Sequence, residues 1–297
     1  MAVLELMNIW AGRRGKEALR GASLSIEAGD AYLLVGKPGS GKTCLLGVAS
    51  GQTVPRSGTV RLFGAEYAKY SRRVGAVVGH PAFFAGLTVK DNLMARAISL
   101  GVPRPDDVVG ELLARFALDA DANAKMGPLP AGAKAWASLA WGLIGSPDLL
   151  VLDDILLGLD PVDRSRMVAV LRRLVSETGL TLFIAAREAG PLMPLATRIG
   201  ILAEGCIRHE YTPDELRDAL RQRVRVRTSN IETTLARLES ELSNADIVLT
   251  GHGSLEVTGS DLDEISRLLD RFPERIVELT ETSVLASDVL GEGGPIC

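Results

Sequence analysis

Three glycines, a lysine and a threonine stand at fixed spacing in the octapeptide Gly36-Lys37-Pro38-Gly39-Ser40-Gly41-Lys42-Thr43. The apolar run Ala31–Val35 directly precedes it, and the apolar residues Cys44-Leu45-Leu46 follow it. The first run has the length of a buried strand, and the second predicts the start of a helix. Glycines adopt backbone dihedrals that other residues avoid, so backbone N–H groups can point together at one anion. The segment therefore predicts a strand, an anion-binding loop and a helix of an α/β protein.

The spacing G-x-x-x-x-G-K-[ST] is that of a P-loop, which binds the phosphates of a nucleotide. The dipole of a helix beginning near Gly41 favours the same anion. Lys42 would reach the β- and γ-phosphates, and the Thr43 hydroxyl would bind Mg²⁺. Asp153 ends the apolar run 149–153 and supplies a second metal ligand. The alternative is a glycine-rich turn without a ligand, but the strand, the helix and both polar residues favour a nucleotide site.

Short apolar runs alternate with segments of helical spacing from the start of the chain to about residue 212. We expect strands at 31–35, 148–153, 181–186 and 198–202, and helices at 45–50, 106–118, 136–145 and 162–177. These strands lack polar alternation, which is typical of a mostly parallel sheet that is covered on both faces. The segments 22–26 and 58–64 alternate with period two and predict an antiparallel subdomain beside it.

The pattern changes after Tyr211-Thr212-Pro213, so we expect one domain at 1–212 and a second at 213–297. In the second domain the order β-α-β-β-α-β predicts a small, ferredoxin-like α+β fold. Its strands are expected at 223–227, 246–250, 254–257 and 275–279, and its helices at 231–242 and 261–272. The arginines of the run 223–227 alternate with valines, which favours a solvated strand face over a nucleic-acid site.

Composition narrows the functional classes. The chain has 33 Lys and Arg residues and 37 Asp and Glu residues, which give a net charge of −4. This overall negative charge does not favour nucleic-acid binding. Three cysteines without a close pair make a disulfide framework or zinc cluster unexpected. No apolar run reaches the length of a membrane span, and the first residues lack a signal-peptide pattern. We expect a reduced, intracellular protein.

Several further segments, in order, resemble the ATP-binding subunit of an ABC transporter over about residues 1–210. Trp10 stands where that family has an aromatic residue stacked on adenine, and Gly158-Leu159-Asp160-Pro161 is similar to its D-loop. The segments 55–60 and 81–93 are similar to stretches that flank the family's Q-loop. The resemblance implies a P-loop NTPase fold with a helical subdomain, and the C-terminal domain resembles the tail of drug- and peptide-export members.

Four family positions are altered. The Q-loop glutamine falls at Gly79, followed by His80, and the catalytic glutamate falls at Asp154. The switch histidine falls at Arg187, which can pair with phosphate as a fixed cation but cannot shuttle a proton. His80 is either a partial substitute for the glutamine or a structural residue. The signature motif falls at Leu129-Pro130-Ala131-Gly132, followed by a helix expected to start near Lys134. Pro130 lacks the hydroxyl and the N–H that the signature serine offers to a phosphate.

The resemblance implies an ATP-binding subunit of an exporter, which binds ATP and Mg²⁺ with impaired hydrolysis. Its partners would be a transmembrane permease subunit and a second ATP-binding subunit, identical or different, at the cytoplasmic face of the membrane. Phe83, Phe84 and Leu87 would then either receive the permease or pack in the core. The alternatives are a soluble regulatory or structural ATP-binding protein and, less consistent with the charge, an ATPase acting on nucleic acid.

Overall fold

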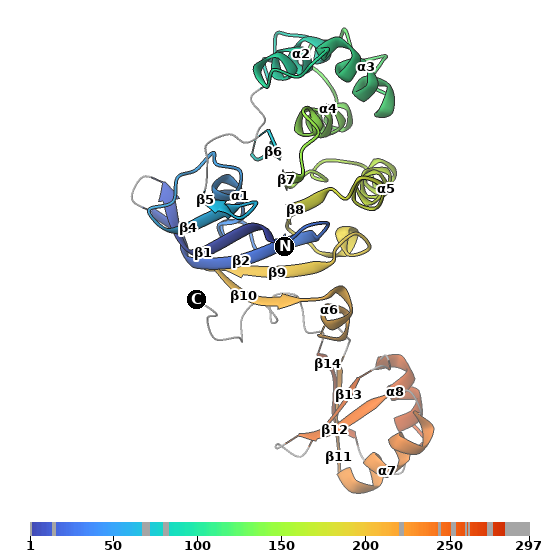
Figure 1. Cartoon of the computed structure of the whole chain (residues 1–297). Helices are drawn as coiled ribbons and strands as arrows, with labels where there is room; N and C mark the ends of the chain where they lie inside the picture. The colour runs from blue at the N-terminus through green and yellow to red at the C-terminus, as the bar shows by residue number, and fades with distance from the viewer. Residues whose placement is uncertain are drawn as a thin grey trace. The chain divides into compact units, whose positions relative to one another are not determined.

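The computed structural model describes residues 2–13, 16–66, 72–79, 83–219, 223–242, 245–250, 254–258, 260, 262–271 and 276–282. The chain divides into two compact units, with the boundary between Pro213 and Asp214. Figure 1 labels the helices and strands of both units. In the described part of the chain, no helix combines the length and the apolar character needed to cross a membrane.

A six-stranded sheet forms the centre of the first unit, in the order β10-β9-β3-β8-β7-β6. The five strands from β9 to β6 are parallel, and β10 is antiparallel to β9. The mostly parallel sheet is therefore confirmed. Its strands in this order are β10 (Cys206–Tyr211), β9 (Arg198–Ala203), β3 (Ala31–Val35), β8 (Thr181–Ala186), β7 (Leu149–Asp153) and β6 (Val74–Val77).

A second, antiparallel sheet has the order β2-β1-β4-β5. Its strands are β1 (Ala2–Arg13), β2 (Lys16–Glu27), β4 (Ser57–Leu62) and β5 (Ala65–Glu66). The helix α1 (Lys42–Ala49) contacts strands of both sheets, and its Leu45 and Leu46 are fully buried in one core with side chains of β1, β7 and β8. This shared core fixes the loop before α1 between the two sheets.

Three helices, α2 (Val89–Ser99), α3 (Pro105–Arg115) and α4 (Ala131–Leu143), lie together beyond β6 and form the helical subdomain (Figure 1). The other helices of this unit are α5 (Pro161–Thr178) and the short 3₁₀ helix η1 (Gly190–Leu192). The predicted start of α4 near Lys134 is wrong, because the helix begins at Ala131, directly after Pro130. The fixed φ of proline suits a helix N-terminus, whereas the small residues that follow carry no apolar periodicity.

The second unit has the expected order of elements after the short helix α6 (Pro213–Ala219). The order β12-β13-β11-β14 and antiparallel pairing throughout match a ferredoxin-like sheet. Val224 and Val226 face its core, while Arg225 lies on the other face and pairs with Glu256 at 3.1 Å. The solvated arginine face is thus confirmed for Arg225. The elements are β11 (Arg223–Thr228), α7 (Ile231–Glu241), β12 (Asp246–Thr250), β13 (Ser254–Thr258), α8 (Leu262–Leu269) and β14 (Ile276–Thr282).

Candidate functional site

The loop between β3 and α1 requires glycine at two positions. Gly41 precedes α1 with φ at 110°, and a Cβ there would lie 2.5 Å from the carbonyl oxygen of Ala18. A Cβ on Gly36 would lie 2.3 Å from the carbonyl oxygen of Leu202. Both glycines let the loop pass close to neighbouring backbone, which is the condition for turning its N–H groups inward.

The Lys42 side chain lies inside this loop. Its Nζ donates to the carbonyl oxygens of Gly36 at 2.6 Å and Lys37 at 3.1 Å, and the residue is only 7% exposed. Burial lowers the pKa of the Lys42 ammonium, and the carboxylates of Asp154 and Asp153 oppose that shift. The ammonium has three N–H donors and uses two of them here, so one remains for an incoming anion.

The residues present fit a polyphosphate. The Ser40 Oγ is buried and has no hydrogen-bond partner among the described residues, although buried hydroxyls normally have one. The Thr43 side chain at the start of α1 is exposed, and the N–H groups of the first helical turn carry the positive end of the dipole. The donors, the buried ammonium and the orphan hydroxyl together form a site for phosphate oxygens.

Two carboxylates stand at the carboxyl end of β7, with Asp153 as its last residue and Asp154 directly after it. Asp153 accepts a hydrogen bond from the backbone N–H of Gly79 at 3.3 Å, through its Oδ2. Asp154 has φ at 47°, a conformation in which a residue other than glycine is strained. Its backbone N–H donates to the carbonyl oxygen of Ala185 at 3.0 Å, and its carbonyl accepts from Leu157 at 2.8 Å. The main chain therefore fixes where the Asp154 side chain begins.

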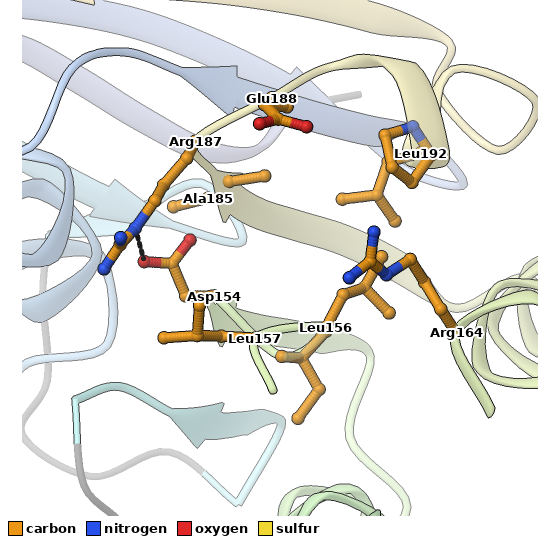
Figure 2. Close-up of a pocket in the computed structure, with 11 residues that line it drawn as sticks. Asp154, Leu156, Leu157, Arg164, Ala185, Arg187, Glu188 and Leu192 are labelled. Carbon is orange, nitrogen blue, oxygen red and sulfur yellow. Dashed lines mark ion pairs between the residues drawn. The ribbon is translucent and has the colours of Figure 1, made fainter. Parts of the chain in front are cut away.

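Arg187 follows β8 and faces Asp154 at one end of a pocket of about 170 Å³ (Figure 2). The Arg187 Nε lies 3.5 Å from Asp154 Oδ2, and this ion pair is drawn as a dashed line. Val35 of β3 pairs with Ala186 of β8, and Asp153 of β7 pairs with Ala185. The structure thus brings Lys42, Asp153, Asp154 and Arg187 to one edge of the sheet. The pairing of Arg187 with Asp154 was not expected from the sequence.

The residues at the signature position begin α4. Leu129 is buried, Pro130 caps the helix, and Ala131 and Gly132 form its first turn. A Cβ on Gly132 would lie 2.8 Å from Asp163 Oδ2, so a carboxylate approaches this helix start.

Asp163 belongs to the cap of the next helix, α5. The Asp160 side chain caps α5 by accepting from the Asp163 N–H at 2.8 Å. The sequence reasoning missed Asp163, although its position three residues after a capping aspartate was a visible signal.

Among the described residues, no hydrogen bond or strand pairing joins Trp10 to this cluster. Trp10 lies in β1 opposite Arg20 of β2 and Ser57 of β4, with a partly exposed side chain whose Nε1 donates to Asn8 Oδ1 at 3.1 Å. Part of the Trp10 side chain is thus open to solvent. His80 lies outside the described residues.

Relatives share this arrangement of strand, loop and helix. The ABC transporter family profile matches residues 19–156. The Nod factor export ATP-binding protein I of Burkholderia lata is 33% identical over 222 residues, which cover 73% of each chain. The bacitracin transport ATP-binding protein BcrA of Bacillus licheniformis is 26% identical over 266 residues, covering 88% of this chain and 86% of BcrA.

The fold is also found among solved structures. A dimeric, post-hydrolysis structure of the ATP-binding cassette MJ0796 with ADP and phosphate superposes with a TM-score of 0.64 at 21% identity. The match covers 71% of this chain and 98% of the cassette. Together with the identity to the export protein, this places the sequence motifs on the fold for which they are typical. The chain belongs to the ABC transporter family and is one of its ATP-binding subunits.

Proposed function

We propose that this ATP-binding subunit serves an exporter, in which it binds Mg-ATP at the interface with a second ATP-binding subunit and drives a transmembrane permease. Two of the relatives are named for bacitracin transport and Nod factor export, and BcrA matches this chain over most of both lengths. The spermidine/putrescine import ATP-binding protein PotA of Spiroplasma citri, at 32% identity, matches over only 63% of its own length. The export relatives therefore support the proposal more fully.

The observation that carries the proposal is the buried Lys42 ammonium on the two P-loop carbonyls. Lys42 would bind the β- and γ-phosphates, with backbone N–H groups of the residues from Gly39 to Thr43 around them. The Thr43 hydroxyl and the Asp153 carboxylate would hold Mg²⁺, which neutralises charge on the phosphate oxygens when it is bound. Trp10 would stack on the base.

Hydrolysis would be slow. Asp154 occupies the position of the base, but its side chain is one methylene shorter than glutamate and is paired with Arg187. Gly79 has no side chain with which to hold a water or the metal, and Arg187 cannot exchange a proton. A displacement of about 1 Å at a positioned base costs ~100-fold in rate.

The surface offered to a second ATP-binding subunit is also altered. Pro130 donates neither an N–H nor a hydroxyl, and the Asp163 carboxylate near Gly132 opposes an anion at the start of α4. As a homodimer the subunit would have two weak sites. Beside an intact partner subunit, one site would contain the altered base and switch positions, Asp154 and Arg187, and the other would contain the altered signature. Homo- and heterodimer both remain compatible with these residues.

The permease would meet the helical subdomain at the cytoplasmic face of the membrane, which makes the subunit peripheral. Phe84 is 61% exposed and Leu87 is also exposed, whereas Phe83 packs edge-on against Trp141 at 5.2 Å. The buried Asn92 side chain holds this segment by accepting from the Phe84 N–H at 2.8 Å and donating to its carbonyl at 3.1 Å. An anchored segment with exposed apolar side chains suits a protein contact.

A second candidate is a regulatory or structural ATP-binding protein that never joins a transporter. Such a protein binds ATP without needing fast hydrolysis, which fits the altered Gly79, Asp154 and Arg187. Purification from membranes separates the two functions. A permease should co-purify with the parent protein and be lost when Phe84 and Leu87 are both changed to Ser. Recovery of the protein without any multi-helix membrane partner favours the regulatory function.

The binding site itself is tested by changing Lys42 to Ala. Removing the ammonium should abolish binding of Mg-ATP or weaken it at least ~10-fold, because a charge-assisted contact to phosphate contributes about 1.5–3 kcal/mol. Titration calorimetry measures this directly. The exposed Lys37→Ala change, which removes a lysine side chain from the same loop, is the matched control and should have a smaller effect. Equal titration curves for the parent and Lys42→Ala would contradict the assignment.

A further inference from the structure

Four charged side chains lie around the mouth of the P-loop, two of each sign. Lys42 and Asp153 occupy the positions for phosphate and metal, and Asp154 and Arg187 form an ion pair beside them. In the family pattern a neutral or titrating histidine stands at the position of Arg187. Arg187 carries a permanent positive charge and therefore attracts a bound phosphate more strongly than a neutral histidine would.

The two members of the ion pair differ in freedom. Asp154 is fixed by backbone hydrogen bonds to Ala185 and Leu157, and its side chain is 27% exposed. Arg187 projects from the end of β8 with a side chain that is 53% exposed (Figure 2). At 3.5 Å between Nε and Oδ2 the contact is a simple ion pair rather than a bidentate one. Arg187 can leave Asp154 at little cost, whereas Asp154 has little freedom to follow.

A terminal phosphate bound by Lys42 would meet both groups, because the P-loop, Asp154 and Arg187 directly follow strand ends that are paired side by side in the sheet. The guanidinium attracts this phosphate and the carboxylate repels it. An arginine also binds phosphate oxygens more strongly than a single surface carboxylate, since it can use two parallel N–H donors.

We infer that the Asp154 carboxylate competes with the terminal phosphate of ATP for Arg187, so that the ion pair closes without nucleotide and opens for a triphosphate but not for a diphosphate. Asp154 is then a positioning residue that holds Arg187 beside the site, and its presence lowers the preference for ATP over ADP. This inference rests on the proposed binding of ATP at the P-loop and adds the origin of its nucleotide preference.

The test compares dissociation constants for ADP and for the non-hydrolysable β,γ-imido analogue of ATP, both with Mg²⁺. In Asp154→Asn the analogue should bind roughly three- to tenfold more tightly while ADP changes less than about twofold, since the lost competitor is one exposed ion pair and one nearby like charge. In Arg187→Gln the analogue should bind more weakly and the ratio of the two constants should approach one. Because each ratio is measured on one protein, a partly unfolded sample does not distort it.

The matched control is Glu188→Gln, which removes the same charge from an exposed carboxylate that also lines the pocket (Figure 2). It should leave the ratio unchanged. In the double variant Asp154→Asn with Arg187→Gln, the gain from the first change should fall to the part that comes from removing a like charge, because no guanidinium remains to be released.

Three outcomes would overturn the inference while leaving the proposed function standing. They are unchanged or weaker analogue binding in Asp154→Asn, an equal gain in Glu188→Gln, and full persistence of the gain in the double variant. Failure of the parent to bind either nucleotide, with no difference in Lys42→Ala, overturns the proposed function together with the inference. The two failures are therefore distinguishable.

Discussion

The side chain of Asp154 ends one methylene short of a glutamate, on a backbone that hydrogen bonds to Ala185 and Leu157 hold in place. Restoring the longer side chain with Asp154→Glu should therefore raise the steady-state turnover of ATP. We expect a gain of about tenfold or more, because a well-placed base contributes ~10²–10⁴-fold and the other altered positions remain. Release of phosphate under saturating Mg-ATP measures the gain.

The companion variant Asp154→Asn removes the carboxylate without changing its size. Its turnover should stay close to the slow parental rate, since a base that is misplaced and paired with Arg187 contributes little. Brisk parental turnover that Asp154→Asn abolishes would show that this aspartate is a competent base. The interpretation of a degenerate ATPase would then be wrong, although membership of the family would stand.

Residue types and spacing predicted the P-loop well, because each fixed residue of that loop has one task that few other residues can perform. The glycines at 36 and 41 have no room for a Cβ, and the Lys42 ammonium lies inside the loop on its carbonyl oxygens. The ion pair between Asp154 and Arg187 was not predictable, since its members come from two strands whose ends meet only in the folded sheet. Assignments made from the family positions alone, such as Trp10 for adenine, remain predictions.

At the level of elements, α4 packs unusually close to β6 because two glycines face each other. A Cβ on Gly75 of β6 would lie 2.0 Å from the carbonyl oxygen of Gly142 in α4. Gly75→Ala should therefore lower the free energy of unfolding by about 1–3 kcal/mol, as overpacking forces the helix away from the sheet. Urea denaturation measures the change.

The control for this variant is Gly110→Ala in the exposed part of α3, where a Cβ meets no atom within 4 Å. It should raise the free energy of unfolding by about 0.5–1 kcal/mol, because alanine loses less entropy than glycine in a helix. A neutral Gly75→Ala would mean that α4 and β6 are farther apart than the structure shows.

Strand β3 also carries a buried tyrosine whose ionisation is coupled to folding. The Tyr32 hydroxyl donates to Glu210 Oε1 at 2.6 Å, and Arg198 pairs with Glu210 Oε2 at 2.9 Å. Burial, followed by the charge of Glu210, raises the pKa of Tyr32 well above its usual value. The folded state therefore keeps this proton at a pH where the unfolded chain has lost it.

This raised pKa predicts a stability that is complete below pH 10 and falls as the pH rises above it. From pH 8 to pH 10.5 the parent should lose about 0.8 kcal/mol relative to Tyr32→Phe, because only the unfolded parent gains from ionising this phenol. Other titrating groups are common to both proteins and cancel in the difference. If the free energy of unfolding of the parent, minus that of Tyr32→Phe, stays constant or increases over this pH range, Tyr32 is not buried as a neutral phenol.

The sequence predicted elements best where the apolar pattern was uninterrupted. The runs 31–35 and 181–186 became β3 and β8 without a shift. The long strand β1 was missed because its register shifts after Leu6 and at Trp10, and Asn8 has φ at 50°, so the period of two is broken. The helix α2 was not assigned, although Val89, Leu93 and Ala97 recur at a helical spacing of four and are buried. The helix α4 was assigned too late, because it begins without an apolar periodicity.

At the level of the whole molecule, the two units have separate hydrophobic cores. The core of the second unit consists of its own side chains, among them Val224, Val226 and Leu255, all fully buried. Every described residue of the proposed nucleotide site belongs to the first unit. A fragment of residues 1–219, which keeps α6 whole, should therefore fold and bind Mg-ATP within about threefold of the full chain, a difference well below that of one charge-assisted contact.

The second unit can also be unfolded selectively in the full-length chain, without truncation. Val226→Asp places an uncompensated charge in the core of the second unit and should unfold that unit, at a cost of several kcal/mol. Proteolysis should then remove the C-terminal part while titration calorimetry shows unchanged binding of Mg-ATP. If instead both the fragment and Val226→Asp remain folded in their first unit, by circular dichroism, yet bind nucleotide at least ~10-fold more weakly, the second unit takes part in the site. The C-terminal unit would then regulate nucleotide binding, and the prediction that the first unit alone suffices for it would be wrong.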